Sequence, residues 1–148
     1  MTQNFTSLND SHTDALTAIV GADNLSRRGA DLDLHNRDQS RHPMGNAQAV
    51  IWPHTAEQIA AVLKYCNEQR IPVTPWGVGT SLEANPLARY GGVSLSMEKM
   101  TRILEVHVDD FQVTVEPGIG HKDLNAQLSR FGLFFPPDPG ANATIGGM

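Results

Sequence analysis

Residues 75–82, with the sequence PWGVGTSL, constrain the fold of this chain more than any other stretch. Gly77 and Gly79 are separated by one residue, and glycine adopts positive φ freely and lets a ligand approach the main chain. Thr80 and Ser81 add hydroxyl and N–H groups, and the stretch contains no Lys or Arg. Successive N–H groups in such a turn can form a concave site for an anion. The stretch therefore predicts either a phosphate-binding turn built from amides and hydroxyls or a tight turn without a ligand.

The residues before this turn predict a strand followed by a helix. Residues 47–52 form a short apolar run, which is consistent with a buried strand. Thr55 followed by Gln58 matches a capping box, and the helix is expected to run to Arg70. Its apolar face repeats at helical spacing, at Ile59, Val62, Leu63 and Cys66.

Residues 71–75 predict a second strand, and its two prolines, Pro72 and Pro75, favour a position at the edge of a sheet. Strand, helix and strand make a βαβ unit, whose two strands should be parallel with a right-handed crossover. Ligands of open parallel sheets bind at the carboxyl ends of the strands, and the glycine turn follows such an end. This placement favours the phosphate-binding interpretation.

The next part of the chain predicts further strands. Polar and apolar residues alternate with the period of a strand at 92–96, 103–108 and 112–116. Asp109 and Asp110 predict the turn of an antiparallel hairpin between the last two. A second helix is expected from about His121 until Gly132, with an apolar face of Leu124, Leu128 and Phe131. The predicted fold class is α+β, a βαβ unit followed by a small mixed or antiparallel sheet with a second helix.

Residues 1–46 carry weaker patterns. A short helix is expected between a cap at Asp10–Ser11 and an end at Gly21, with apolar residues at Leu16, Ile19 and Val20. Residues 26–46 are polar with charges of both signs, and we expect an extended connecting segment at the surface. The chain thus divides into an N-terminal helix and extended segment, residues 1–46, and a more regular domain, residues 47–148.

The composition restricts the chemistry. The formal net charge is −5, which argues against nucleic acid as a partner, because binding to a phosphate backbone needs a basic surface. Cys66 is the only cysteine, so no internal disulfide can form, and we expect it to be a small buried hydrophobe. No apolar run is long enough for a transmembrane segment, and the N-terminus lacks a secretory signal pattern, so a cytoplasmic location is the default. The six histidines lack metal-ligand spacing, and no metal is expected.

Residues 134–148, FFPPDPGANATIGGM, form a second unusual stretch. Its three prolines favour a rigid extended segment, and Gly140, Gly146 and Gly147 allow a close approach of other groups. A rigid segment of this kind is either a linker or one wall of a ligand site.

Three motifs, PWGVGTSLE at 75–83, GVSL at 92–95, and PPDPG with ATIGGM within 136–148, together resemble a known family. The family is the FAD-linked oxidases with a flavin-binding domain of the vanillyl-alcohol oxidase and p-cresol methylhydroxylase (PCMH) type. Within it, the chain is most similar to the branch of D-lactate dehydrogenase (cytochrome) and the glycolate oxidase large subunit. The resemblance implies the N-terminal part of a PCMH-type FAD-binding domain at residues 47–148, truncated at its C-terminal end.

The resemblance also implies how FAD would be held. The pyrophosphate is expected on the first turn, which comprises Gly77, Val78, Gly79, Thr80 and Ser81, with Leu82 beside it. The isoalloxazine is expected near Pro137 and Asp138, and the phosphates and ribityl chain along Thr144, Ile145, Gly146 and Gly147. The sequence departs from the family where Val78 replaces a glycine and where Ala84-Asn85 replaces Gly-His. Members with covalent flavin carry His near the position of Thr80, so FAD is expected to be noncovalent here.

The activity that the resemblance implies is oxidation of a 2-hydroxy acid of the D-lactate or glycolate type. In that reaction a base takes the hydroxyl proton and the α-hydrogen passes to the flavin as hydride. The family's substrate-binding cap domain has no counterpart in these 148 residues, so we expect a fragment of a longer protein and assign no catalytic residue. The electron acceptor and any peripheral membrane contact of the full-length protein stay open. The alternatives are another FAD-linked alcohol or sugar oxidoreductase on the same scaffold and a noncatalytic remnant.

Overall fold

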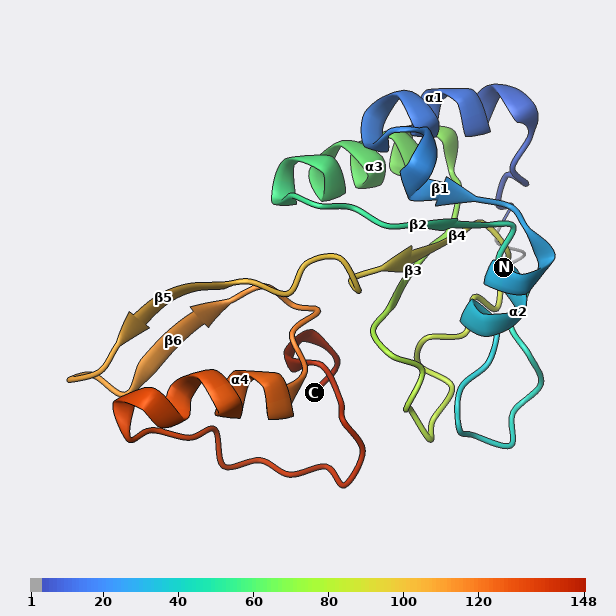
Figure 1. Cartoon of the computed structure of the whole chain (residues 1–148). Helices are drawn as coiled ribbons and strands as arrows, with labels where there is room; N and C mark the ends of the chain where they lie inside the picture. Colours follow the sequence, from blue (N-terminus) through green and yellow to red (C-terminus); the bar gives the residue numbers. More distant parts are fainter. Residues whose placement is uncertain (1–3) are drawn as a thin grey trace.

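A four-stranded sheet organises the first part of the chain in the computed structural model, which describes residues 4–148 (Figure 1). The strands lie in the order β1–β2–β4–β3, with the bounds Leu25–Ser26, Ala49–Ile51, Val93–Ser96 and Val73–Trp76. Strand β4 pairs in parallel with β2 on one side and with β3 on the other, whereas β1 pairs antiparallel with β2. The two strands of the predicted βαβ unit are therefore parallel, with β4 inserted between them. Strand β3 lies at the edge of the sheet, as its prolines predicted.

Two helices, α1 (Asp10–Val20) and α3 (Ala56–Gln69), lie side by side over one face of this sheet (Figure 1). Helix α3 begins at the predicted cap, because Thr55 Oγ1 accepts a hydrogen bond from Gln58 N at 3.2 Å. The second bond of the predicted capping box is displaced by one residue, since Gln58 Oε1 accepts from His54 N at 2.8 Å. The core beneath the helices contains Leu16, Val20, Ala49, Ile51, Val62, Cys66, Val93 and Leu95. Burial raises the pKa of the Cys66 thiol to about 11, which confirms the expectation of a buried hydrophobe.

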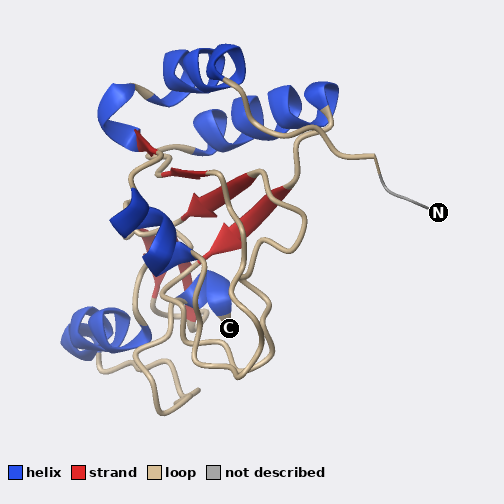
Figure 2. Ribbon diagram, turned by 90° about the vertical axis from the view of Figure 1, so that its right-hand side faces the viewer, coloured by secondary structure: helices blue, strands red, loops and turns tan. Residues whose placement is uncertain are grey.

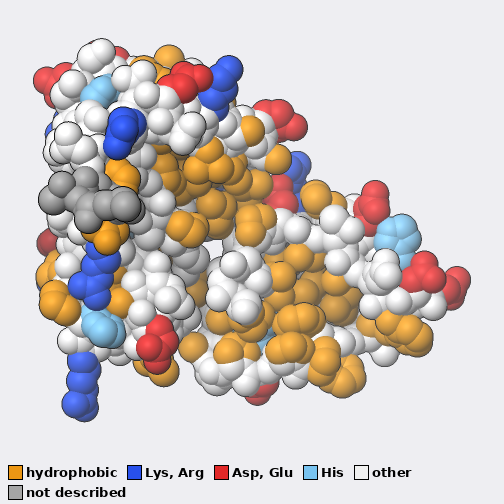
Figure 3. Space-filling model, turned by 180° about the vertical axis from the view of Figure 1, so that it is seen from behind, with side chains coloured by type: hydrophobic (Ala, Val, Ile, Leu, Met, Phe, Trp, Pro, Cys, Tyr) orange, Lys and Arg blue, Asp and Glu red, His pale blue; other side chains and the backbone are white. Residues whose placement is uncertain are grey.

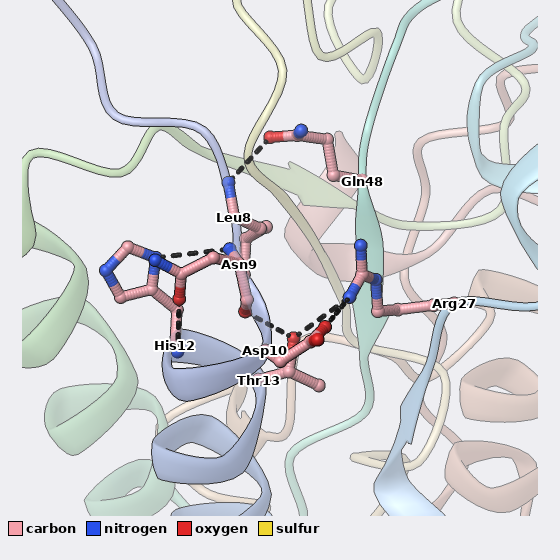
Figure 4. A network of polar contacts seen from close by, with 7 residues as sticks. All are labelled: Leu8, Asn9, Asp10, His12, Thr13, Arg27 and Gln48. Atoms are coloured by element: carbon pink, nitrogen blue, oxygen red, sulfur yellow. Dashed lines mark hydrogen bonds and ion pairs between the residues drawn. The ribbon is translucent and has the colours of Figure 1, made fainter.

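Polar contacts tie helix α1 to the sheet, and Figure 4 shows them. The N-cap is Asn9, one residue before the predicted cap, because its side chain accepts a hydrogen bond from the first turn of the helix. Arg27 directly follows β1, and its Nη1 forms an ion pair with Asp10 Oδ1 at 3.2 Å. Gln48 Oε1 accepts a hydrogen bond from Leu8 N at 3.1 Å. The chain before α1 is thereby connected to the start of β2.

The prediction of an extended surface segment over residues 26–46 is wrong in part. The segment contains helix α2 (Gly29–His35), and both His35 and Asn36 are buried. Asn36 Oδ1 accepts a hydrogen bond from Ala47 N at 2.7 Å, and Asn36 Nδ2 donates to Ala47 O at 3.5 Å. The polar composition hid this burial, because polar groups are compatible with a protein interior once they have hydrogen-bond partners.

A hairpin and helix α4 (His121–Leu128) form a second packed unit beside the sheet (Figure 1). Strand β5 (Ile103–His107) pairs antiparallel with β6 (Gln112–Val115), which confirms the predicted hairpin. Side chains of α4 pack against both strands, and Figure 3 shows apolar side chains on the back of this unit. The predicted helix ends early, because its last turn becomes a tighter 3-10 turn that leaves Phe131 46% exposed. The 3-10 turns of the chain are Ala22–Asn24, Ser129–Phe131 and Ile145–Gly147.

We expect Asn36→Ala to lower the free energy of unfolding by about 1–3 kcal/mol, because it leaves the buried N–H of Ala47 without a partner. Urea unfolding of the full-length protein measures this change. The matched control is Leu34→Ala, on the exposed side of α2, which should change stability by less than about 0.5 kcal/mol. Equally small effects of the two variants would contradict a structural role of the buried amide.

Candidate functional site

The glycine turn and the C-terminal segment line one cavity, although they are far apart in the sequence. The cavity has a volume of about 650 Å³, a size typical of small-molecule sites. Figure 2 shows helices α1 and α3 on one side of the sheet and the loops gathered on the other side, around the C-terminus. Nine of the twelve residues predicted to hold a cofactor line this cavity: Gly77, Val78, Gly79, Thr80, Ser81, Leu82, Thr144, Gly146 and Gly147.

Three of the predicted residues are not among those that line the cavity. Ile145 packs against the apolar cluster between α4 and the hairpin. Asp138 is an exposed side chain on the proline-rich segment, and its Oδ1 lies 3.7 Å from Nε2 of the buried His121. Pro137 precedes it on the same segment. The structure therefore divides the second predicted segment, and only part of it reaches the cavity.

Sequence reasoning missed several residues of the cavity. Met97 and Pro117 follow the ends of β4 and β6, and only the order of the strands brings them beside the glycine turn. Trp76 is the last residue of β3, and the turn motif alone does not predict that it lines the cavity. The remaining lining residues are Pro75, Glu83, Asn85, Pro86, Pro139, Ala143 and Met148.

The lining of the cavity is almost free of charged side chains. Glu83 is the one Asp, Glu, Lys, Arg or His side chain among the described residues that line it. No three His, Cys, Asp or Glu side chains lie close enough together within residues 4–148 to hold a metal ion. Across the same residues, no helix combines the length and the apolar character needed to cross a membrane.

The N–H groups of the first turn are open. Among the hydrogen bonds of residues 4–148, none is donated by the backbone N–H of Gly77, Val78, Gly79, Thr80 or Ser81. Backbone N–H groups normally find a partner when they are removed from water, so a run of five open donors beside a cavity is a suitable environment for an anion.

The N–H groups of the second segment are occupied. Ile145 N donates to Ile119 O at 2.9 Å, and Gly146 N donates to Pro117 O at 2.8 Å. Gly147 N donates to Thr144 O at 3.0 Å. This segment is therefore held to the chain that follows β6, and it offers the cavity few free main-chain donors.

Two contacts explain why glycine stands at both positions of the turn. A Cβ atom on Gly77 would lie 2.7 Å from Thr144 Oγ1, so a side chain there would require the Thr144 hydroxyl to move. Gly79 has a φ of +66°, and a Cβ atom there would lie 3.0 Å from Cζ2 of Trp76. The steric and conformational demand for glycine is therefore stronger at position 79 than at position 77.

A partly exposed polar cluster around Glu98 reaches Trp76 through the buried ring of His35. Glu98 Oε2 accepts hydrogen bonds from Trp52 Nε1 and from Ser96 Oγ, both at 2.8 Å, and it lies 3.5 Å from His35 Nε2. The neighbouring His35 ring is the largest cause that lowers the pKa of Glu98 to about 2, and the two hydrogen bonds add to it. These contacts outweigh partial burial, which acts in the opposite direction.

Comparison with protein families shows which family the regular part of the chain belongs to. The family described as "FAD binding domain" matches residues 47–148. The chain is 40% identical over 131 residues to "Probable D-lactate dehydrogenase, mitochondrial" of Danio rerio, covering 88% of this chain and 26% of that protein. It is 44% identical over 128 residues to "D-lactate dehydrogenase (cytochrome), mitochondrial" of Arabidopsis thaliana, covering 85% and 23%. Its identity to "Glycolate oxidase subunit GlcD" of Bacillus subtilis is 32%, covering 89% and 28%. The chain thus spans about a quarter of the length of these relatives.

Solved structures share the fold. A structure of alkyldihydroxyacetonephosphate synthase has a TM-score of 0.84 at 19% identity, covering 97% of this chain and 29% of that one. A structure of p-cresol methylhydroxylase with substrate bound has a TM-score of 0.73 at 23% identity, covering 84% and 25%. The helix and strand arrangement therefore matches that of PCMH-type domains, as the sequence predicted.

Glu98→Gln should destabilise the protein above pH 4.5, the ordinary pKa of the group, and the difference should shrink as the pH falls toward 2. The reason is that a carboxyl with a lowered folded-state pKa stabilises the fold only while it is ionised. Thermal unfolding of the full-length protein between pH 6 and pH 3, read against wild type, measures the difference. Glu68→Gln, which changes an exposed carboxyl on α3, is the control. A difference that stays constant over this range would contradict the interaction.

Proposed function

The chain belongs to the family of FAD binding domains, and from that premise we propose that residues 47–148 hold the pyrophosphate of FAD on the turn after β3. The observation that carries the proposal is the run of five open N–H groups at residues 77–81, all on residues that line the cavity. Amide donors bind phosphate without a basic side chain, which agrees with the absence of Lys and Arg from the described lining. Leu82 follows as an apolar neighbour of the bound group.

The opposite wall is assigned with the same proposal. Thr144, Gly146 and Gly147 line the cavity, and we assign them to the phosphates and the ribityl chain. Their N–H groups are largely occupied, so they contribute shape and the Thr144 hydroxyl rather than a row of donors. Ile145 supports this wall from its apolar side. The assignment of Pro137 and Asp138 to the isoalloxazine rests on the family resemblance alone.

We further propose that FAD is bound noncovalently. Thr80, at the position where relatives with covalent flavin carry His, offers a hydroxyl that forms no such bond. No His or Cys occurs among the described residues that line the cavity. Extraction of the cofactor with denaturant, without proteolysis, distinguishes the two modes of attachment.

For the full-length protein we propose oxidation of a 2-hydroxy acid of the D-lactate or glycolate type. The support is the names of three relatives that match this chain at 32–44% identity, two D-lactate dehydrogenases and a glycolate oxidase subunit. Bound FAD supplies the acceptor for hydride from the substrate carbon. The residues described here position the cofactor, and no catalytic base is assigned among them.

A second candidate is another FAD-linked alcohol or sugar oxidoreductase on the same scaffold. The structural likeness to p-cresol methylhydroxylase supports this second candidate through the shared fold alone. The noncatalytic alternative predicts no turnover with either substrate class. The cytoplasmic location, the peripheral membrane contact and the electron acceptor stay as open expectations for the full-length protein.

Gly79→Val should abolish retention of FAD, because the branched side chain would meet the Trp76 ring and strain a turn at φ +66°. The measurement is the flavin absorbance of the purified full-length protein. Gly132→Val is the matched control, since Gly132 has φ +69°, has open space around it and does not line the cavity. A Gly79→Val protein as yellow as wild type would refute the role of the turn.

The substrate proposal predicts that D-lactate or glycolate bleaches the flavin absorbance of the full-length protein under anaerobic conditions. Bleaching follows from hydride transfer to the bound cofactor. Simple alcohols and sugars are the comparison, and faster bleaching by one of them would replace the proposed substrate class with the second candidate. Binding of FAD without bleaching by any of these compounds would favour the noncatalytic alternative.

A further inference from the structure

His35, the last residue of helix α2, is buried outside the segment that the FAD binding domain family matches. Its side chain is 1% exposed. The ring lies against the indole of Trp76, with 4.2 Å between the ring centroids and an angle of 43° between the planes. A second indole, that of Trp52, meets the same ring edge-on at 5.5 Å and 86°. His35 is thus enclosed between two aromatic side chains and is not among the residues that line the cavity.

Both ring nitrogens of His35 face oxygen acceptors. Nδ1 lies 2.9 Å from the main-chain oxygen of Asp31. Nε2 lies 3.5 Å from Glu98 Oε2 and has no hydrogen-bond partner within ordinary distance and angle among residues 4–148. The contact with Asp31 O fixes one edge of the ring, and the other edge faces the Glu98 carboxylate.

The Trp76 indole, which packs against His35, also lies against the glycine turn. Trp76 Cζ2 is the atom nearest to the position of a Cβ on Gly79, at 3.0 Å. The chain that follows His35 also contacts the turn, because Gln39 N donates a hydrogen bond to Ser81 O at 3.1 Å. Arg37 O lies 3.4 Å from the position that a Cβ atom on Gly79 would take. Residues 35–39 therefore support the turn without lining the cavity themselves.

We propose that His35 is a positioning residue for the cofactor turn, which it holds in place through Trp76 without touching the cofactor. The open N–H groups of residues 77–81 bind an anion only if their directions are fixed in advance, because preorganised dipoles do not have to reorient on binding. Loss of the ring would free the Trp76 indole and, with it, the turn. The proposal rests on the proposed binding of FAD to this turn.

The first test is titration of FAD into the full-length apoprotein, followed by flavin fluorescence. His35→Ala should weaken FAD binding about tenfold, the effect of one lost supporting contact. Leu34→Ala, the exposed neighbour on the same helix, should bind FAD like wild type. Val62→Ala removes buried volume from the core beneath α3 and away from the lining of the cavity. It should lower thermal stability while leaving FAD affinity unchanged.

A double-mutant cycle tests whether His35 acts through Trp76. In a Trp76→Leu background, His35→Ala should cause little further loss of FAD affinity, because the contact between the two rings is already gone. The near-ultraviolet circular dichroism of the indoles should also change in His35→Ala but not in Leu34→Ala. Should His35→Ala fail to fold, His35→Gln keeps polar atoms at the site without the ring and takes its place in the cycle.

The outcomes separate this inference from the proposed function. If wild type fails to bind FAD, the proposed function is wrong. If wild type binds FAD and the His35 variants bind it equally well, the positioning role is wrong and the proposed function stands. If the losses in His35→Ala and Trp76→Leu are fully additive, His35 does not act through Trp76 and the inference is overturned. An equal loss of affinity in Val62→Ala would likewise overturn it, because general destabilisation would then explain the effect.

Discussion

The parallel pairing of β3 with β4 is the contact on which the cavity depends. β3 lies at the edge of the sheet, where Pro75 is tolerated although proline has no N–H to donate, and Pro72 directly precedes the strand. The pairing ends where Trp76 meets Ser96, and the chain turns away immediately afterwards. The N–H groups of the next residues have no strand to bond with, so they stay available. The edge position therefore explains both the proline of the strand and the open donors of the turn.

The second wall of the cavity follows from a different constraint. The β5–β6 hairpin carries the chain away from the sheet and returns it at Pro117, whose carbonyl accepts a hydrogen bond from Gly146 N. That bond holds the segment whose Thr144 side chain lies close to Gly77. One wall thus presents free main-chain donors, whereas the other uses its donors to hold its own shape. The proposed anion is therefore assigned to the first wall of the cavity.

The sequence predicted those features that local patterns determine. The cap of α3 at Thr55 and the edge position of β3 depend on neighbouring residues, and both predictions are confirmed. Contacts that depend on the order of the strands could not be predicted, since nothing in the local sequence places Met97 beside the glycine turn. Burial of Asn36 was missed because a hydrogen-bonded polar side chain in the interior has the same composition signal as one at the surface.

The absence of Lys and Arg from the described lining of the cavity makes its geometry decisive. A Lys or Arg side chain attracts phosphate over several ångströms and adapts its position by rotating flexible bonds. An amide N–H binds only within hydrogen-bond distance and along its own direction. A site that replaces cations with amides therefore needs a main chain fixed from outside the cavity. Residues 35–39 contact Trp76 and Ser81 without lining the cavity, so a segment outside the matched domain supports the turn that we propose as the anion site.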